Sequence, residues 1–287
     1  MNNVIHQGTL RATAALLSVL ALPAHATYSW TFTTETNPDQ GTCTAASVGN
    51  NCTQSSTDAS KTIGVTATAW ASSTSSTSSS LEKATLNLWD GLAVNAQGET
   101  NTAPEHATDN NTKIESILFA FSDKITLQSI TMGWHTDADF SLLRYTGTGA
   151  PNLSTSTYNT LTTNGWELVG NYTYSENLSS GTDITAQVSS SSADNYTGPL
   201  DANNASKTIN ANNLSSSYWL ITALNGAFWN DASYIGNDYF KVKNLTGSYS
   251  NTPPPTGRTP EPSTIALLVI AFASWYGNQR KKQTLSA

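Results

Sequence analysis

Histidines and acidic residues are the first candidates for chemistry in this chain. Two histidines lie outside the N-terminal 26 residues, His106 and His135, and three aspartates lie near them: Asp109, Asp137 and Asp139. A serine hydrolase needs a histidine base within hydrogen-bond reach of a serine, and an acid that orients the histidine. The chain has neither the G-x-S-x-G nor the H-E-x-x-H motif. We therefore expect no enzymatic activity, and a secreted hydrolase is the least favoured alternative.

The same aspartates could instead bind a cation. Asp137 and Asp139 are two positions apart, so their side chains share one face if the segment is extended. Ca²⁺ takes about six to eight oxygen ligands, and Asp109 could add a third carboxylate. The three residues are thus a candidate calcium site, although no EF-hand loop is present. The alternative is that they form the hydrogen bonds and Asx-turns that stabilise loops.

Tryptophans offer a different kind of binding chemistry. Seven of them lie between residues 27 and 250: Trp30, Trp70, Trp89, Trp134, Trp166, Trp219 and Trp229. A sugar can pack its C–H face on an exposed indole, whose polar edge stays hydrated. Most of these tryptophans fall in segments with strand composition, where packing in the core is the default. Trp229, in the segment GAFWND, is the best loop candidate for contact with a glycan.

The N-terminus is typical of a secretory signal peptide. Arg11 supplies a positive charge, Ala12–Leu22 is apolar, and Ala24 and Ala26 form a small-x-small cleavage site. The apolar run is too short to span a membrane comfortably. We expect the Sec translocon to export the chain and signal peptidase to leave Thr27 as the first residue.

Export bears on Cys43 and Cys52, the two cysteines of the chain. A cysteine pair in an exported protein usually forms a disulfide. Both cysteines lie in a polar segment that we expect to be a loop, so the bond would add modest stability. A metal site is less favoured, because no histidine or further cysteine lies close by in the sequence.

The C-terminus has three parts in a fixed order. Pro260, Glu261 and Pro262 precede the apolar run Ile265–Tyr276, and the basic cluster 280–282 follows. Each proline fixes its own φ and biases the preceding residue away from helix, so the first part presents an extended backbone. The positive-inside rule keeps the basic cluster in the cytoplasm. This order closely resembles the PEP-CTERM sorting signal of Gram-negative bacteria.

The resemblance implies a partner and a destination. PEP-CTERM proteins are handled by exosortase, a membrane cysteine transpeptidase. The hydrophobic sorting helix would insert transiently in the inner membrane, and the cut protein would reach the cell surface or its extracellular polysaccharide matrix. The apolar run is short against the ~20 residues of a comfortable span, which suits a transient anchor. An ordinary C-terminal anchor behind a proline-rich stalk is the alternative.

Residues 27–250 have the composition of an all-β domain. Nine segments are rich in β-branched and aromatic residues and bounded by turn-forming residues: 28–32, 62–70, 84–89, 114–121, 125–134, 140–145, 166–174, 218–224 and 239–245. With no convincing long amphipathic helix, they predict a single β-sandwich or jelly-roll-like domain. In 125–134, alternation places Ile125 and Leu127 on one face and Ile130 on the other.

The chain therefore divides into four parts. They are a signal peptide (1–26), a β-sandwich ectodomain (27–250), a proline-rich linker with the PEP motif (251–262), and a sorting helix with a basic tail (263–287). Five blocks of the ectodomain resemble, in their order, the ectodomain of exosortase-dependent surface proteins: TAPEHATDN, GWHTDADFSLLRYTG, WELV, SSYWLI and DYFKVK. That resemblance implies secretion and surface display, and no particular activity.

The charge of the chain narrows the choice of partners. The formal net charge is −7, and such a surface repels phosphate backbones, so nucleic-acid binding is disfavoured. An acidic surface suits cations or neutral glycans. We expect a non-catalytic structural or interaction ectodomain, with a Ca²⁺-assisted carbohydrate-binding module as the alternative.

Overall fold

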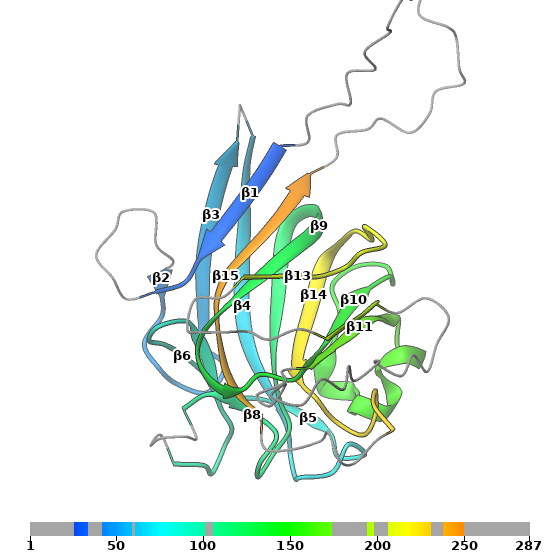
Figure 1. Ribbon diagram of the computed structural model, residues 1–287. Coiled ribbons are helices and arrows are strands. Elements are labelled where there is room, and N and C mark those ends of the chain that lie inside the picture. Colours follow the sequence, from blue (N-terminus) through cyan, green and yellow to red (C-terminus); the bar gives the residue numbers. More distant parts are fainter. Residues whose placement is uncertain are drawn as a thin grey trace, which may run out of the picture. The chain divides into compact units, whose positions relative to one another are not determined.

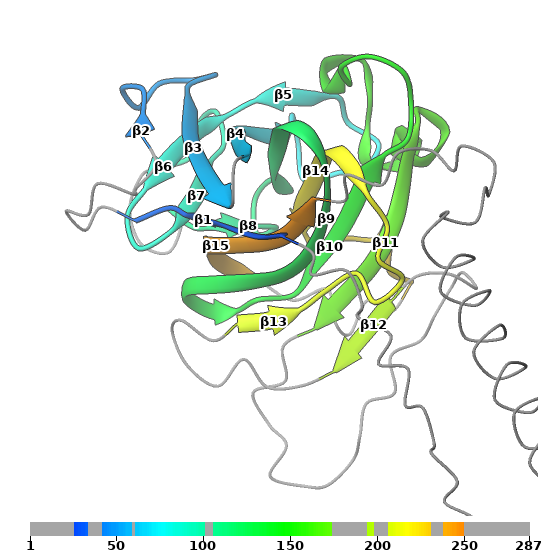
Figure 2. The ribbon, with the colours of Figure 1, turned by 90° about the horizontal axis from the view of Figure 1, so that it is seen from above.

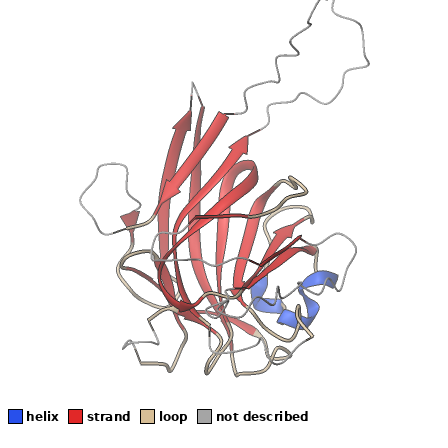
Figure 3. Cartoon of the chain, viewed as in Figure 1, coloured by secondary structure: helices blue, strands red, loops and turns tan. Residues whose placement is uncertain are grey.

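The computed structural model describes residues 26–33, 42–58, 61–100, 106–173, 194–197, 206–230 and 238–249. All of them belong to one unit, Met1–Ser250. Most described residues are in strands, and two short 3-10 helices lie together at one side (Figure 3). The prediction of an all-β domain is confirmed. The expected PEP motif and sorting helix lie outside the described residues, as does the expected signal peptide apart from Ala26.

The strands are, in chain order, β1 (Ala26–Thr31), β2 (Thr42–Cys43), β3 (Asn51–Asp58), β4 (Lys61–Ser72), β5 (Leu81–Lys83), β6 (Thr85–Leu88), β7 (Leu92–Asn95), β8 (Thr108–Asp109), β9 (Glu115–Asp137), β10 (Phe140–Tyr145), β11 (Trp166–Thr173), β12 (Asp194–Thr197), β13 (Ser206–Thr208), β14 (Ser216–Ala223) and β15 (Tyr239–Tyr249). The helices are η1 (Leu153–Thr155) and η2 (Tyr158–Thr163). No helix in the described part of the chain is long and apolar enough to cross a membrane.

β9 joins the two layers of the sandwich. Its first part, up to Phe121, pairs with β4 and β14, and its second part, from Thr126, pairs with β15; Ile125, just before that part, pairs with β14. Between them the chain bends through the exposed residues Ser122 and Lys124, so that β9 forms an arch (Figure 1). The first layer runs β3-β4-β9-β14-β10-β11-β12, and the second contains β6, β7, β15 and β9, with β1 and β8 also on β15.

The core lies between these layers. Trp30 of β1 meets Phe121 of β9 with ring centroids 4.8 Å apart, and its indole N–H donates to the Ile63 carbonyl at 2.9 Å. Phe140 and Phe240 meet from opposite layers at 6.1 Å. Full burial of one such side chain contributes roughly 1.5–3 kcal/mol. The layers approach each other where β1 lies between β15 and β3 (Figure 2).

A β-bulge changes the alternation expected for 125–134. Leu127 pairs with Gly247 and Ser129 with Thr246, so β9 has one extra residue, Gln128, opposite β15. Ile130 is therefore fully buried on the same core as Ile125 and Leu127. The prediction that Ile130 faces the other way is wrong, because period-two reasoning assumes an unbroken ladder.

A second apolar cluster covers the outer face of the first layer. The segment that holds η1 and η2 packs Tyr158 and Leu161 against strand residues such as Leu143 and Leu220, and all four are fully buried. The Tyr158 hydroxyl donates to the Ile114 carbonyl at 3.0 Å. The first layer is thus covered on both faces.

The predicted disulfide between Cys43 and Cys52 is present. The sequence predicts a loop here, and that prediction is wrong. The two cysteines face each other across strands β2 and β3. The bond therefore connects neighbouring strands.

Candidate binding site

Of the three predicted calcium ligands, the structure describes the side chains of two, Asp109 and Asp139. Asp109 is fully buried, and its Oδ1 accepts a hydrogen bond from the Asn111 backbone N–H at 3.0 Å, which is an Asx-turn. Asp139 is also buried, and the side chain of Asp137 is outside the described set. Among the described residues, no three His, Cys, Asp or Glu side chains are placed to hold a metal ion.

Asp109 belongs instead to a buried group of carboxylates. Its backbone N–H donates to Glu115 Oε2 at 3.0 Å, while Glu115 Oε1 has no hydrogen-bond partner among the described residues. Burial raises the pKa of Glu115 well above its usual value, and the charges of Asp109 and Glu99 raise it further. Glu115 is thus a carboxyl group that favours its neutral form.

Trp229 does not present a ring to solvent. Only 5% of this residue is exposed. It closes a turn in which the backbone N–H groups of Trp229 and Phe228 both donate to the Asn225 carbonyl at 3.1 Å. The side chain of Asn171 donates to the Phe228 carbonyl at 3.0 Å and attaches the turn to β11. The loop folds back on the domain, so the expected glycan contact at Trp229 is wrong.

Trp89 is the exposed tryptophan among the described residues. It is 65% exposed and lines a pocket with a volume of about 1120 Å³. His106, Trp134 and Lys241 line the same pocket, together with Asp90. We call this space the Trp89 pocket. It is formed by segments that are far apart in the sequence.

A tight hairpin holds Trp89 in place. Trp89, Asp90 and Gly91 connect β6 to β7, and the Trp89 N–H donates to the Gly91 carbonyl at 3.1 Å. Asp90 has φ 51° and Gly91 has φ 120°. The φ of Gly91 would be strained for any residue with a side chain. A Cβ on Gly91 would lie 2.9 Å from the Cβ of Lys241. The hairpin therefore packs directly on β15.

Gly133 allows the same hairpin to pack on β9. A Cβ at this position would collide with the carbonyl oxygen of Asp90. The absence of that side chain brings the hairpin against the strand beside Trp134. Two glycines, from two segments, thus bring the two tryptophans to one pocket.

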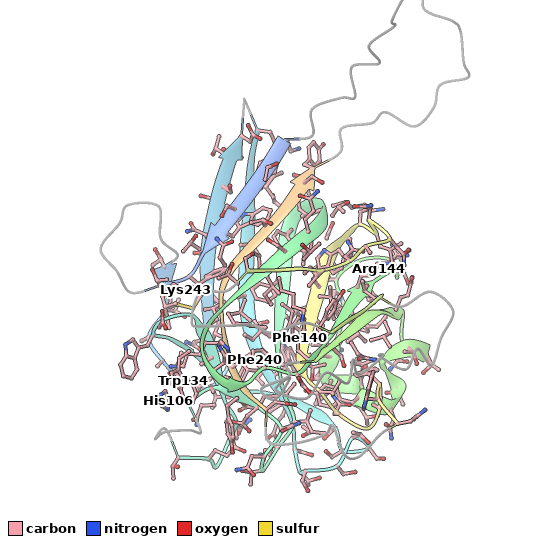
Figure 4. The ribbon with its side chains drawn as sticks, viewed as in Figure 1. His106, Trp134, Phe140, Arg144, Phe240 and Lys243 are labelled. Atoms are coloured by element: carbon pink, nitrogen blue, oxygen red, sulfur yellow. A yellow bond between two sulfur atoms is a disulfide. The ribbon has the colours of Figure 1, made fainter. Side chains whose placement is uncertain are left out.

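Three aromatic rings form a row in the pocket. The centroids of Trp89 and His106 are 5.9 Å apart with an interplanar angle of 20°, and those of His106 and Trp134 are 6.2 Å apart with 15°. Figure 4 shows His106 beside Trp134, away from the core residues Phe140 and Phe240. The row is a set of nearly parallel flat faces that is exposed at its Trp89 end.

Two lysines of β15 set the charge of this region. Lys241 Nζ lies 5.0 Å from the centroid of the Trp89 ring and donates to the Trp89 carbonyl at 3.2 Å. Lys243 Nζ forms an ion pair with Asp90 Oδ1 at 2.7 Å. Burial lowers the pKa of Lys241, and the charge of Asp90 partly opposes that shift.

The sequence contains only partial signals for this pocket. Trp89 and Trp134 both fall in segments with strand composition, and His106 is a candidate base by its residue type. The WDG triplet at Trp89 was the available signal, because glycine after aspartate favours a tight turn. Nothing in the sequence pairs this turn with Lys241, about 150 residues further on.

No model of a known protein family matches this chain, and neither does any curated protein or solved structure.

Proposed function

We propose that this chain is an exported surface protein whose ectodomain is a non-catalytic interaction module that binds carbohydrate in the Trp89 pocket. The observation that carries the proposal is the row of Trp89, His106 and Trp134. Nearly parallel rings with one exposed end suit the flat C–H faces of sugar rings. The pocket, at about 1120 Å³, has room for a short oligosaccharide.

The polar groups of the pocket support a sugar over a purely apolar ligand. Asn87, Asp90 and Lys241 lie among the lining residues, next to the indoles. A ligand that uses both kinds of group must have an apolar face and hydroxyl or charged edges. Carbohydrates have this combination, and aliphatic ligands lack it.

A glycan array tests this part of the proposal. The exported protein should bind at least one class of oligosaccharide, and Trp89→Ala should lower its affinity at least about tenfold, as for an aromatic residue at the centre of an interface. Val48→Ala is the matched control, because Val48 is also an exposed apolar residue and is not a lining residue. Parallel arrays with Ca²⁺ and with a chelator test whether calcium assists. Binding that is the same in wild type and Trp89→Ala would contradict the proposal.

Export and sorting form the second part of the proposal. The signal-peptide pattern before Thr27 and the order of PEP motif, apolar run and basic cluster support it. On this proposal exosortase cuts the chain near Pro260, Glu261 and Pro262. The ectodomain then reaches the cell surface or the polysaccharide matrix of a Gram-negative cell.

Replacement of the three PEP residues by alanine tests the sorting step. Export should continue, with Thr27 as the N-terminus by mass spectrometry, because the signal peptide is unchanged. The uncut protein should accumulate in the inner membrane with its C-terminal tail attached. If the variant is cut and displayed like the parent, Pro260, Glu261 and Pro262 do not direct the cut, and the sorting part of the proposal is wrong.

A further inference from the structure

The geometry points to an acidic sugar: we propose that the Trp89 pocket binds a uronic acid unit, whose carboxylate pairs with the ammonium group of Lys241. This inference rests on the proposed carbohydrate binding and adds its chemical class. It differs from the expectation of a neutral glycan that the net charge of the whole chain suggests.

Lys241 is held at the pocket with little access to water. The residue is 3% exposed, and its chain packs over Gly91 of the hairpin. Its Nζ lies 5.0 Å from the Trp89 ring centroid and 6.0 Å from that of Trp134. The charge thus lies close to both of the indoles that would hold a sugar.

Among the described residues, no carboxylate forms an ion pair with Lys241. Asp90, an acidic residue that lines the pocket, forms its ion pair with Lys243 at 2.7 Å. Lys241 has three N–H donors, and the hydrogen bond that the structure gives it is the one to the Trp89 carbonyl at 3.2 Å. The charge of Asp90 offsets only part of the desolvation of the Lys241 ammonium, and the carboxylate of an arriving ligand would offset more of it.

The arrangement selects among ligand classes. A cationic ligand would be repelled by Lys241, and a neutral sugar would leave the ammonium desolvated. A hexuronate has a C–H face for the indole and a carboxylate on its rim for the lysine. Because the net charge of the chain is −7, the protein as a whole does not attract a polyanion. Binding of an acidic oligosaccharide would therefore depend on the contact with Lys241.

Calorimetric titration of the exported protein tests the inference. The probes are an oligogalacturonate and the same oligosaccharide after reduction of its carboxylates to primary alcohols. Wild type should bind the acidic form at least about tenfold more tightly, as expected for a charge-assisted hydrogen bond. Lys241→Met should remove this preference, while Lys124→Met, the same charge change at the exposed bend of β9, should retain it.

The outcomes separate the two proposals. If the reduced oligosaccharide binds wild type equally well, or if Lys241→Met keeps the preference for the acidic form, the acidic-sugar inference is wrong while carbohydrate binding stands. If no oligosaccharide binds wild type here or on the array, both proposals fail. Circular dichroism of Lys241→Met guards against misfolding, and Lys241→Gln repeats the test with a polar side chain.

Discussion

Two glycines determine where the exposed indole of Trp89 lies. Gly91, with φ 120°, packs against β15. Gly133 of β9 leaves room for the carbonyl group of Asp90. Gly91 also packs against the side chain of Lys241, whose Nζ lies 5.0 Å from the centroid of the Trp89 ring. A change at either glycine therefore acts on the pocket without removing any group that a ligand would touch.

Gly133→Ala tests this dependence. The new methyl group must displace the Asp90 carbonyl, so we expect a loss of about 1–3 kcal/mol in the free energy of unfolding and a loss of ligand affinity. Urea denaturation and titration with the best array ligand measure the two effects. Gly64→Ala is the control, because a Cβ there meets nothing within 4 Å. Equal stability and affinity of Gly133→Ala and wild type would show that the hairpin is not held at this point.

Glu115 gives a pH-dependent prediction. Its pKa is raised in the folded state, so protonation favours folding. Its contribution to stability is largest below the unfolded pKa of about 4.5 and falls as pH rises to the folded pKa. Glu115→Gln should therefore raise the melting temperature at pH 7, by about 2–4 °C for each kcal/mol gained.

The difference between the two proteins identifies the effect of this one group. Thermal unfolding of wild type and Glu115→Gln between pH 4 and pH 8 should give curves that converge at the acidic end and separate toward neutral pH. A Glu115→Gln protein that melts below wild type at pH 7 would show that the charged carboxylate stabilises the fold.

At the scale of elements, apolar strands could be predicted and polar ones could not. Residues 140–145 are β10 as expected, because an apolar run between turn residues is a strong signal. β3 was missed, since its sequence NCTQSSTD is polar and Thr53, Ser55 and Thr57 are exposed. The two segments that meet in β9 also could not be joined from the sequence, because the bend is visible only through its partners.

The disulfide leads to a prediction at the scale of elements. It links β2 to β3, and Cys43 lines the Trp89 pocket. Replacing both cysteines by alanine should lower the free energy of unfolding by about 2–3 kcal/mol, because the cross-link no longer restricts the unfolded chain. Native thiol labelling of wild type should find neither cysteine free. Thr57→Ala in the same strand should cost no more than roughly 0.5 kcal/mol, and a double variant as stable as that control would contradict the account.

At the scale of the whole molecule, the sandwich brings together pocket residues that are far apart in the chain. The β6–β7 hairpin gives Trp89, the turn before β8 gives His106, β9 gives Trp134 and β15 gives Lys241. The sequence could predict the all-β class and the presence of many tryptophans. It could not show which indole is exposed, because exposure depends on long-range packing such as that of the hairpin on Gly133.

The most direct measurement of the central claim is the oxidation of tryptophan in the purified protein by N-bromosuccinimide, followed by peptide mass spectrometry. Trp89, at 65% exposure, should react first among the seven tryptophans between residues 27 and 250, all of which the structure describes. A saturating oligosaccharide should then protect it, since the sugar would cover the indole face. Oxidation of Trp89 at an unchanged rate while the oligosaccharide is bound would place the binding site elsewhere and contradict the account.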